Sequence, residues 1–295
     1  MRYKFSGHQT FAFRHGWLEK GVDLIRTNPH GFLDDDAIVK LGVGKNMVDS
    51  IKYWCVQTGL LCDAATSGDM QLTEFAKFIF GEDKDSGVDP YLEDDATLWL
   101  LHHKIVTNES ESSISIAFNS LNKPEFSKPE LLAFINRYLD GKAVVSTKTL
   151  ERDIDCFIHV YAGTRGKNIE DNFDCPFLAL ALVQPTIDQN LFRMNIGSKQ
   201  SLPSEFVGYA LLDIIGDGSN TINLYSATYD SRSPGQVFKL NEDDVVSAIN
   251  DLERKTDGKF SFTDTAGLNS IRIDVRDGRS VLAKSLLTSY YGGHA

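Results

Sequence analysis

Cysteine and long apolar runs are both scarce in this chain. Its 295 residues include four cysteines, none in a CxxC pair, and no apolar run approaches the roughly 20 residues that cross a membrane. Isolated cysteines without a secretory signal are typical of free thiols in a reducing cytoplasm, and their spacing argues against structural zinc. We therefore expect a cytoplasmic protein without a membrane-spanning segment.

A basic excess is also missing, since the formal net charge is −11. Proteins that coat nucleic acid without sequence specificity are usually basic, because neutralised phosphates supply that affinity. The acidic residues are unevenly placed: residues 63–111 hold 12 acidic and 3 basic residues, whereas residues 1–61 hold 6 acidic and 8 basic ones. Residues 123–170 hold 7 acidic and 8 basic residues. The sequence therefore excludes a general nucleic-acid coat but permits local basic faces.

The stretch KFSGHQTFAFRHGW, which begins at Lys4, combines aromatic rings with many polar side chains. It has no apolar core, so it is not a signal peptide. One interpretation is a phosphate or metal site, in which Arg and His are suitable ligands and His a suitable base. The other is a structural plug, in which buried rings hold polar groups that satisfy one another. The candidate catalytic residues are His8, Gln9, Arg14 and His15, with Thr10 beside them.

Residues 35–72 have the order of a winged helix-turn-helix: a short helix over 35–40, the glycine turn LGVG, a helix from Lys45 to Thr58, and two short strands. A further helix starts at Thr73. The apolar positions of the second helix fall on one face, which predicts a buried Trp54. Its open face is predicted to hold Lys45, Asn46, Asp49, Ser50 and Lys52.

Lys and Asn side chains can read base edges in the major groove, so Lys45, Asn46 and Lys52 are candidate DNA contacts. A winged helix that contacts protein instead is the alternative. A second helical, winged-helix-like module follows, with Pro129 in a first turn and Ser146 as a cap. The outward side chains of this module add four candidates for DNA contact: Lys148, Thr149, Arg152 and Arg165.

The last part of the chain alternates strand-like segments (LFRMNI, TINLYSATY, KFSFTDT, SIRIDV) with amphipathic helices, one of which Asn241 should cap. The segment SSISIAF alternates like a strand but is short, so its type stays open. We predict a helix-rich α+β fold, with winged helix-turn-helix modules followed by a mixed α+β C-terminal domain. The predicted domains are residues 1–111, 112–173 and 174–295.

Carboxylates are the protein ligands that Mg²⁺ prefers, so Asp34, Asp35 and Asp36 are candidate metal ligands. Consecutive residues of a helix point in different directions, however, and acids at a helix start also oppose its dipole. The same alternative holds for Asp94 and Asp95, and the adjacent pair His102–His103 also diverges. The sequence leaves both interpretations open.

Three stretches, KFSGHQTFAFRHGWLEKG, DPYLEDDATLWLLHHKI and SPGQVFKLNEDDV, together resemble a bacterial domain-of-unknown-function family that includes SspB. SspB is the strand-nicking component of the single-strand DNA phosphorothioation system. The resemblance implies a metal-dependent nickase, using Mg²⁺ or a similar ion, that opens one strand for sulfur incorporation in restriction-modification and anti-phage defence. It also implies DNA, a cysteine desulfurase, an ATP-pyrophosphatase-like protein and an ATPase as partners.

The resemblance carries no assigned catalytic residues onto this chain. The sequence has no HNH, PD-(D/E)xK or GIY-YIG pattern, so a non-catalytic DNA-binding adaptor or transcriptional regulator is the alternative function. Whether the chain forms a homodimer also stays open at this stage.

Overall fold

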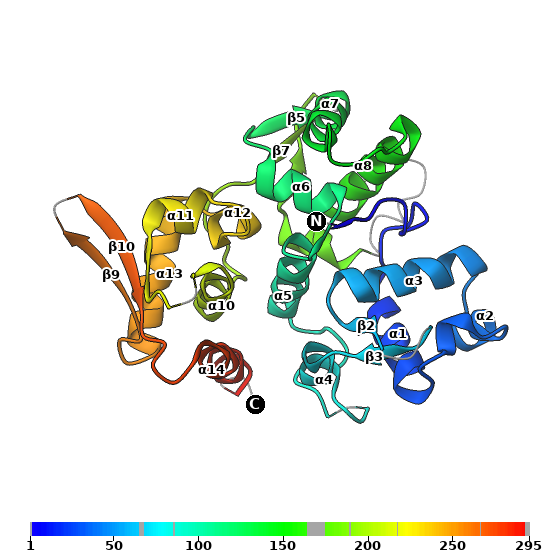
Figure 1. Cartoon of the computed structure of the whole chain (residues 1–295), viewed down its shortest axis with the longest axis horizontal. Coiled ribbons are helices and arrows are strands. Elements are labelled where there is room, and N and C mark those ends of the chain that lie inside the picture. Colours follow the sequence, from blue (N-terminus) through cyan, green and yellow to red (C-terminus); the bar gives the residue numbers. More distant parts are fainter. Residues whose placement is uncertain are drawn as a thin grey trace. The chain divides into compact units, whose positions relative to one another are not determined.

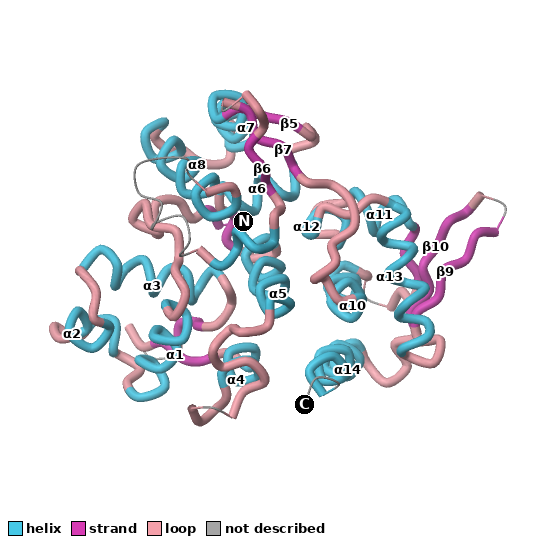
Figure 2. The backbone as a smooth tube through the Cα atoms, turned by 180° about the vertical axis from the view of Figure 1, so that it is seen from behind, coloured by secondary structure: helices cyan, strands magenta, loops and turns pink. Residues whose placement is uncertain are grey.

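The computed structural model describes residues 2–64, 68–84, 86–163, 175–188, 190–216, 218–265 and 267–292. Two compact units account for the chain: an N-terminal unit, Met1–Ala117 with Leu121–Met194, and a C-terminal unit, Phe118–Ser120 with Asn195–Ala295. Helices dominate both units and the sheets are small (Figures 1 and 2), which confirms the predicted helix-rich α+β class. None of the described helices is long and apolar enough to cross a membrane.

The domain boundaries predicted after residues 111 and 173 stay predictions. The second boundary and Arg165 lie outside the described residues.

Short elements make up the N-terminal unit. In chain order they are β1 (Arg2–Tyr3), α1 (Trp17–Thr27), η1 (Gly31–Leu33), α2 (Ala37–Leu41), α3 (Lys45–Gln57), β2 (Leu61–Asp63), β3 (Met70–Leu72), α4 (Glu74–Phe80), α5 (Asp95–Val106), β4 (Ser110–Glu111), α6 (Ser113–Ser120), β5 (Glu125–Ser127), α7 (Lys128–Leu139), α8 (Thr147–Tyr161), η2 (Pro176–Leu180), β6 (Val183–Pro185) and β7 (Leu191–Met194). Strand β1 pairs with β4 in parallel, β2 with β3 antiparallel, and β5, β7 and β6 form an antiparallel sheet in that order.

The elements α2, α3, β2, β3 and α4 follow in the order that the sequence predicted. Gly42 ends α2 in the left-handed region, with φ of 67°, which a glycine adopts without strain. Thr73 caps α4 by accepting a hydrogen bond of 3.1 Å from the Ala76 N–H. Trp54 is fully buried on α3, as predicted. Whether these elements act as a DNA-reading winged helix stays a prediction.

The segment whose type stayed open, SSISIAF, is helical: Ser112 is the N-cap of α6, and the other six residues lie in that helix. Its start is fixed by a capping box between Ser112 and Ser115, in which each backbone N–H donates to the other serine's hydroxyl. The strand-like alternation arises because both sides of the helix are buried, Ile114 and Phe118 on one side and Ile116 on the other.

The C-terminal unit consists of α10 (Ser204–Ile214), β8 (Thr221–Asn223), α11 (Leu224–Tyr229), α12 (Pro234–Phe238), α13 (Glu242–Lys255), β9 (Phe260–Thr265), β10 (Leu268–Ile273) and α14 (Arg279–Gly292), together with the last three residues of α6. Strands β8, β10 and β9 form an antiparallel sheet in that order. Asn241 caps α13 as predicted. The strand predicted over TINLYSATY is wrong beyond Asn223, whose side chain accepts a hydrogen bond from the Ser226 N–H and so starts α11.

One lysine in this unit is buried. The Lys239 ammonium donates to the Phe118 carbonyl at 2.6 Å and to Gln236 Oε1 at 3.0 Å, and the side chain is 5% exposed. Burial lowers the pKa of Lys239 to about 7, because desolvation disfavours the charged form. Phe118 belongs to α6, so this bond ties the end of α6 to the segment after α12 within the C-terminal unit.

Candidate nucleic-acid interface

The opening segment, Lys4–Trp17, is built into the N-terminal unit between α3 and α8. The Lys4 N–H extends the β1–β4 pairing by donating to the Glu111 carbonyl at 2.9 Å. On α8, Asp153 accepts from the Ser6 N–H at 2.9 Å and lies 3.1 Å from His8 Nε2. On the other side, the Ser50 hydroxyl of α3 donates to the His8 carbonyl at 3.0 Å.

Aromatic packing holds the same segment down. Phe13 is fully buried, with its ring centroid 5.4 Å from that of Trp54 and 4.7 Å from that of Phe177. The Trp54 indole N–H donates to the Phe11 carbonyl at 3.0 Å. Gly7 lies flat against Tyr53, so close that an added Cβ would be 2.3 Å from the ring. The rings therefore anchor the start of the chain, and burial of their surface offsets the entropy lost on ordering.

Within this anchored segment the backbone makes a strained turn. Ser6, Gln9 and Thr10 have φ of 63°, 48° and 68°, in the left-handed region that non-glycine residues rarely adopt. Such residues cost on the order of 1–3 kcal/mol each and persist where surrounding contacts enforce them. The His8 contacts with both helices supply that enforcement here, and the side chains of Gln9 and Thr10 are exposed. A strained, anchored and exposed polar turn is typical of a functional site.

The four candidate catalytic residues differ in their surroundings. His8 is 3% exposed, and both ring nitrogens are occupied: Nδ1 accepts from the Thr10 N–H at 3.0 Å, so Nε2 carries the proton that faces Asp153. Gln9 and His15 are exposed, and Arg14 is half-buried with its guanidinium 5.8 Å from the Trp17 ring centroid. His8 therefore has the environment of a structural residue, and the other three are the ones that solvent reaches.

On α3, Lys45, Asn46 and Asp49 are exposed and Lys52 is half-buried, as expected for an open face. The prediction that Ser50 shares this face is wrong, because its hydroxyl is fully buried against the His8 carbonyl. Lys4 adds a further basic side chain close to Lys52 of this face. Burial over Tyr53 lowers the pKa of Lys4, Asp63 raises it in part, and the like charge of Lys52 lowers it further.

On α8, Lys148 and Arg152 are exposed and Thr149 is half-buried, with its hydroxyl 2.9 Å from that of the capping Ser146. Arg152 directly precedes Asp153, the residue that holds the opening segment. Similarly, Asp49 directly precedes Ser50 on α3. Asp153 and Ser50, each next to one of these exposed residues, therefore hold the opening segment between α8 and α3.

Two of the three acidic candidates, Asp34 and Asp36, already have a basic partner. Lys40 lies 3.0 Å from Asp34 and 2.9 Å from Asp36, and these hydrogen bonds raise the pKa of Lys40. Asp34 also accepts from the Asn28 amide at 2.7 Å, while Asp35 is exposed. Among the residues that the structure describes, no group of three or more His, Cys, Asp and Glu side chains could hold a metal ion. Asp34, Asp35 and Asp36 as ligands of the implied Mg²⁺ stay a prediction.

The remaining polar candidates have local structural roles. Asp94 caps α5 by accepting from the Ala96 N–H at 2.8 Å, and Asp95 follows it in the first turn of that helix. His102 and His103 are both fully buried, with His102 Nδ1 2.7 Å from the Tyr161 hydroxyl. All four cysteines are free, as predicted, and burial raises the pKa of the Cys175 thiol to about 12.

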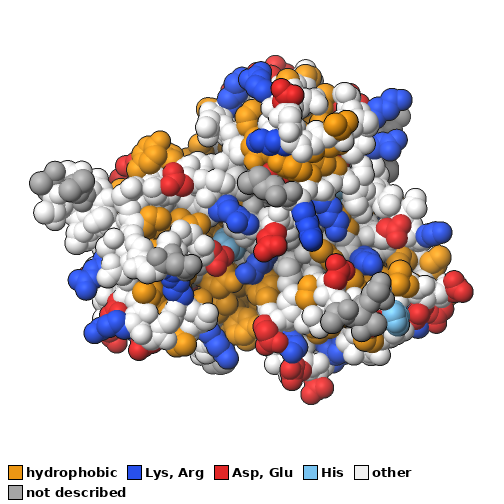
Figure 3. Space-filling view, in the orientation of Figure 1, with side chains coloured by type: hydrophobic (Ala, Val, Ile, Leu, Met, Phe, Trp, Pro, Cys, Tyr) orange, Lys and Arg blue, Asp and Glu red, His pale blue; other side chains and the backbone are white. Residues whose placement is uncertain are grey.

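Charges of both signs are mixed on the face of the molecule that Figure 3 shows. On the face drawn in Figure 3, Lys and Arg side chains alternate with Asp and Glu, and no broad basic band is visible.

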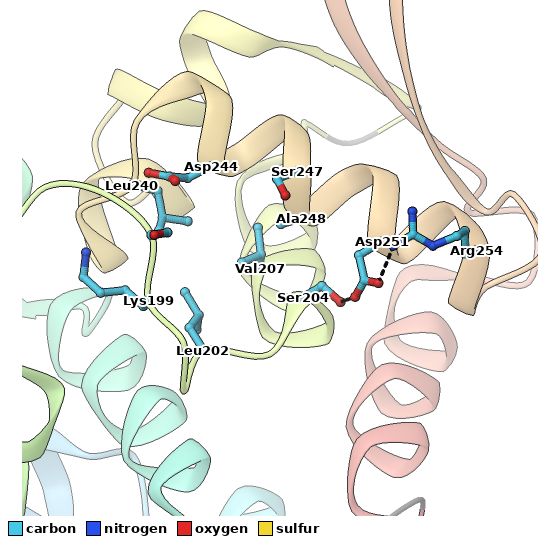
Figure 4. A pocket seen from close by; sticks show the side chains of 11 residues that line it. Lys199, Leu202, Ser204, Val207, Leu240, Asp244, Ser247, Ala248, Asp251 and Arg254 are labelled. Atoms are coloured by element: carbon cyan, nitrogen blue, oxygen red, sulfur yellow. Dashed lines mark hydrogen bonds and ion pairs between the residues drawn. The ribbon is translucent and has the colours of Figure 1, made fainter.

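The C-terminal unit contains a groove that no sequence pattern indicates, because its walls come from two segments, residues 198–207 and residues 240–254. It encloses about 310 Å³ between α13 and the start of α10. Lys199 and Asp244 stand at one end and Asp251 and Arg254 at the other, with Leu202 and Val207 between them (Figure 4). Burial lowers the pKa of Lys199 to about 8, and the nearby Asp244 partly opposes that shift.

The fold described above, with its anchored opening segment, is shared with solved structures of one class of protein, SspB. It is similar to two solved structures, "Magnesium ion-bound SspB crystal structure" with a TM-score of 0.89 and "SspB crystal structure" with a TM-score of 0.88. In both, the sequence identity is 28% over 98% of this chain and 88% of the other. The chain belongs to the family described as "Protein of unknown function (DUF4007)", which matches residues 5–291. No protein of curated function matches it in sequence.

Proposed function

We propose that this protein is the DNA-binding component of a bacterial DNA phosphorothioate modification system. The observation that carries the proposal is the likeness to SspB, which extends over 98% of the chain at 28% identity. The sequence motifs support the same system, because their family includes its nicking component. DNA and the other proteins of that system (a cysteine desulfurase, an ATP-pyrophosphatase-like protein and an ATPase) are the proposed partners, in the cytoplasm.

The DNA contact that we propose is the platform formed by α3, the opening turn and α8. Lys45, Asn46 and Lys52 on α3 would meet the backbone and base edges, as in a helix-turn-helix protein. Lys148, Thr149 and Arg152 on α8 would meet phosphates on the other side of the turn. His8 would act as a positioning residue, since it fixes the turn against both helices.

We further propose that the protein nicks one DNA strand. Arg14 is suited to neutralise the scissile phosphate, and His15 is suited to accept the proton of the attacking water. Gln9 would orient the DNA backbone. The magnesium-bound SspB structure supports a divalent cation, which would supply charge neutralisation when bound. The Asp34 and Asp36 carboxylates are engaged by Lys40, so the proposed proton transfer is not routed through the ion.

A non-catalytic DNA-binding adaptor or transcriptional regulator is the second candidate. One observation favours it: the sequence has no HNH, PD-(D/E)xK or GIY-YIG nuclease pattern. An adaptor would keep the DNA platform and would need neither Arg14 nor His15 for its role.

Relaxation of supercoiled plasmid with purified full-length protein separates the two candidates. For a nickase we expect open-circular product with Mg²⁺ and none with EDTA. Arg14→Ala and His15→Ala should lose product while keeping the melting temperature and the DNA affinity within a factor of about three. Tight DNA binding without product under every metal condition would favour the adaptor. Absence of both binding and nicking would reject the proposal.

A further inference from the structure

The longest strands of the protein, β9 and β10, form a hairpin arm (Phe260–Ile273) in the C-terminal unit. Among its described side chains, those at the base are buried, where Phe260, Ile271 and Ile273 are fully covered. Toward the tip, the described residues from Thr263 to Thr265 are exposed, as is Asn269 on β10. Figures 1 and 2 both show the arm extending beyond α13. A two-stranded hairpin alone is marginally stable in water, so the outer half of the arm lacks the cover that a sheet normally has.

Strand β9 is an edge of its sheet, because the order is β8-β10-β9. Antiparallel pairs alternate between residues that bond across the pair and residues whose N–H and C=O point away. The Asp274 N–H donates to the Lys259 carbonyl at 2.8 Å, which sets the phase of that alternation. In this alternation, Ser261, Thr263 and Thr265 form their backbone hydrogen bonds with β10. Phe262 and Asp264 therefore direct their backbone groups to the open edge.

This edge has few of the features that keep edge strands apart. Natural edges carry lysines, prolines or bulges that prevent pairing with another strand. The sequence of β9, FSFTDT, contains a single charged residue and no proline, and its pairing with β10 is continuous over six residue pairs. The edge is therefore ready to accept a further strand.

We propose that β9 pairs antiparallel with β9 of a second copy of this chain, centred on Thr263. In that register Thr263 faces its own equivalent and Ser261 faces Thr265 of the copy, and such hydroxyl pairs stabilise neighbouring strands. The Thr263 hydroxyl already lies 2.9 Å from the Ser270 hydroxyl, so pairing makes one row of four hydroxyl groups across the joined sheets. Asp264 falls opposite Phe262, which keeps the two Asp264 carboxylates from facing each other.

Charge favours a second copy over nucleic acid as the occupant. The described arm has one acidic residue, Asp264, and one basic residue, Arg272, so its net charge is zero. DNA-binding ribbons rely on Lys and Arg to meet phosphates. A neutral, self-complementary edge fits its own copy better.

Proline substitutions on the two strands form a matched test. Asp264→Pro removes an N–H that points to the open edge and leaves the β9–β10 bonds intact, whereas Asn269→Pro makes the same change on the opposite strand. Analytical ultracentrifugation of the full chain should give a dimer for the wild type and for Asn269→Pro, and a monomer for Asp264→Pro. A monomeric wild type at ~50 μM, where a specific dimer of micromolar Kd is populated, or a dimeric Asp264→Pro variant, would overturn the proposal.

A disulfide tests the register without relying on how the proline variants fold. Directly opposed residues that do not bond across the pair have Cα atoms about 4.5 Å apart, within disulfide range. In a Cys62→Ser background, Thr263→Cys should give a covalent dimer under mild oxidation and Asn269→Cys should not. The three other cysteines are buried, so they should not form crosslinks between copies and serve as negative controls. Equal crosslinking of both variants, or none of Thr263→Cys, would contradict the pairing.

Discussion

Asp153 on α8 and His8 in the opening segment form a buried pair across 145 residues of sequence, with Asp153 Oδ1 3.1 Å from His8 Nε2 and both side chains almost fully covered. The same carboxylate accepts the Ser6 N–H. The pair fixes the start of the chain to the second helical module, and the exposed turn at Gln9 and Thr10 depends on it.

Loss of either partner should destabilise the protein, because it leaves the other buried and unpaired. We expect His8→Ala and Asp153→Ala each to lower the free energy of unfolding by about 3 kcal/mol. Urea unfolding of both variants and of the double variant measures this, and the double-mutant cycle should give a coupling above about 1 kcal/mol. His15→Ala, at an exposed position of the same segment, should stay within about 0.5 kcal/mol of the wild type. A stable His8→Ala variant would refute the structural role.

Gly7 should be intolerant of even one added carbon. An alanine Cβ would lie 2.3 Å from the Tyr53 ring, so the ring or the opening segment must shift, and overpacking of this kind costs about 1–3 kcal/mol. Thermal unfolding of Gly7→Ala should show this loss, and Tyr53→Leu in the same chain should recover part of it. Gly216→Ala is the matched control, because nothing lies within 4 Å of its added Cβ. Equal melting temperatures for both alanine variants would contradict this packing.

Trp54→Ala should be the most damaging single truncation on α3. The indole is fully buried and its N–H bonds to the Phe11 carbonyl, so we expect a loss of about 3–5 kcal/mol. Trp54→Phe keeps most of the volume and removes the hydrogen bond, so its loss should be smaller. Chemical unfolding followed by circular dichroism measures both. A loss below about 1 kcal/mol for the alanine variant would rule out a core role.

The DNA platform predicts a change in salt dependence. Lys45→Glu combined with Lys52→Glu should weaken duplex binding and lower the slope of log affinity against log salt by about 2, since each phosphate contact contributes about 0.9. Fluorescence anisotropy at several salt concentrations gives both quantities. Lys123→Glu combined with Lys284→Glu changes the net charge equally and should leave the slope unchanged. If both double variants had the same slope of log affinity against log salt, Lys45 and Lys52 would not contact the DNA.

Lys239 should make the C-terminal unit more stable as pH rises above neutrality. Its folded pKa of about 7 lies below the ordinary lysine value near 10.4, so between these pH values the unfolded chain binds more protons and stability increases with pH. The slope cannot exceed about 1.4 kcal/mol per pH unit for one group. Hydrogen exchange of the C-terminal unit from pH 6 to 10 measures it, after correction for the intrinsic rates.

Lys239→Met should remove this slope and Lys284→Met, at an exposed position, should keep it. Stability that does not depend on pH in the wild type would mean that the Lys239 amine keeps its ordinary pKa.

Local patterns predicted much of the fold because the relevant contacts are local. The capped starts at Thr73, Ser146 and Asn241 depend on residues within three positions, and the buried face of α3 follows from helical spacing. Where the prediction failed, a competing local bond decided: the Asn223 cap converted a strand-like segment into α11.

The candidate site was less accessible from the sequence because its bonds span long distances along the chain. No local pattern shows that Ser50 bonds to the His8 carbonyl, or that His8 meets Asp153. A signal for the second contact was nonetheless present. Asp153 interrupts the otherwise apolar face of α8 that includes Leu150, Ile154 and Phe157, and a lone acid on such a face needs a partner.

The three residues of α6 that belong to the C-terminal unit limit how this protein can be divided. A fragment beginning at Asn195 would contain Lys239 but not the Phe118 carbonyl to which its ammonium donates. Such a fragment would bury an amine that has lost the closer of these two hydrogen-bond acceptors. The C-terminal unit therefore cannot be transferred complete, by recombination or cloning, as one continuous segment of the chain. A permuted gene that places residues 113–120 directly before Asn195, through a flexible linker, is the arrangement in which it could be transplanted.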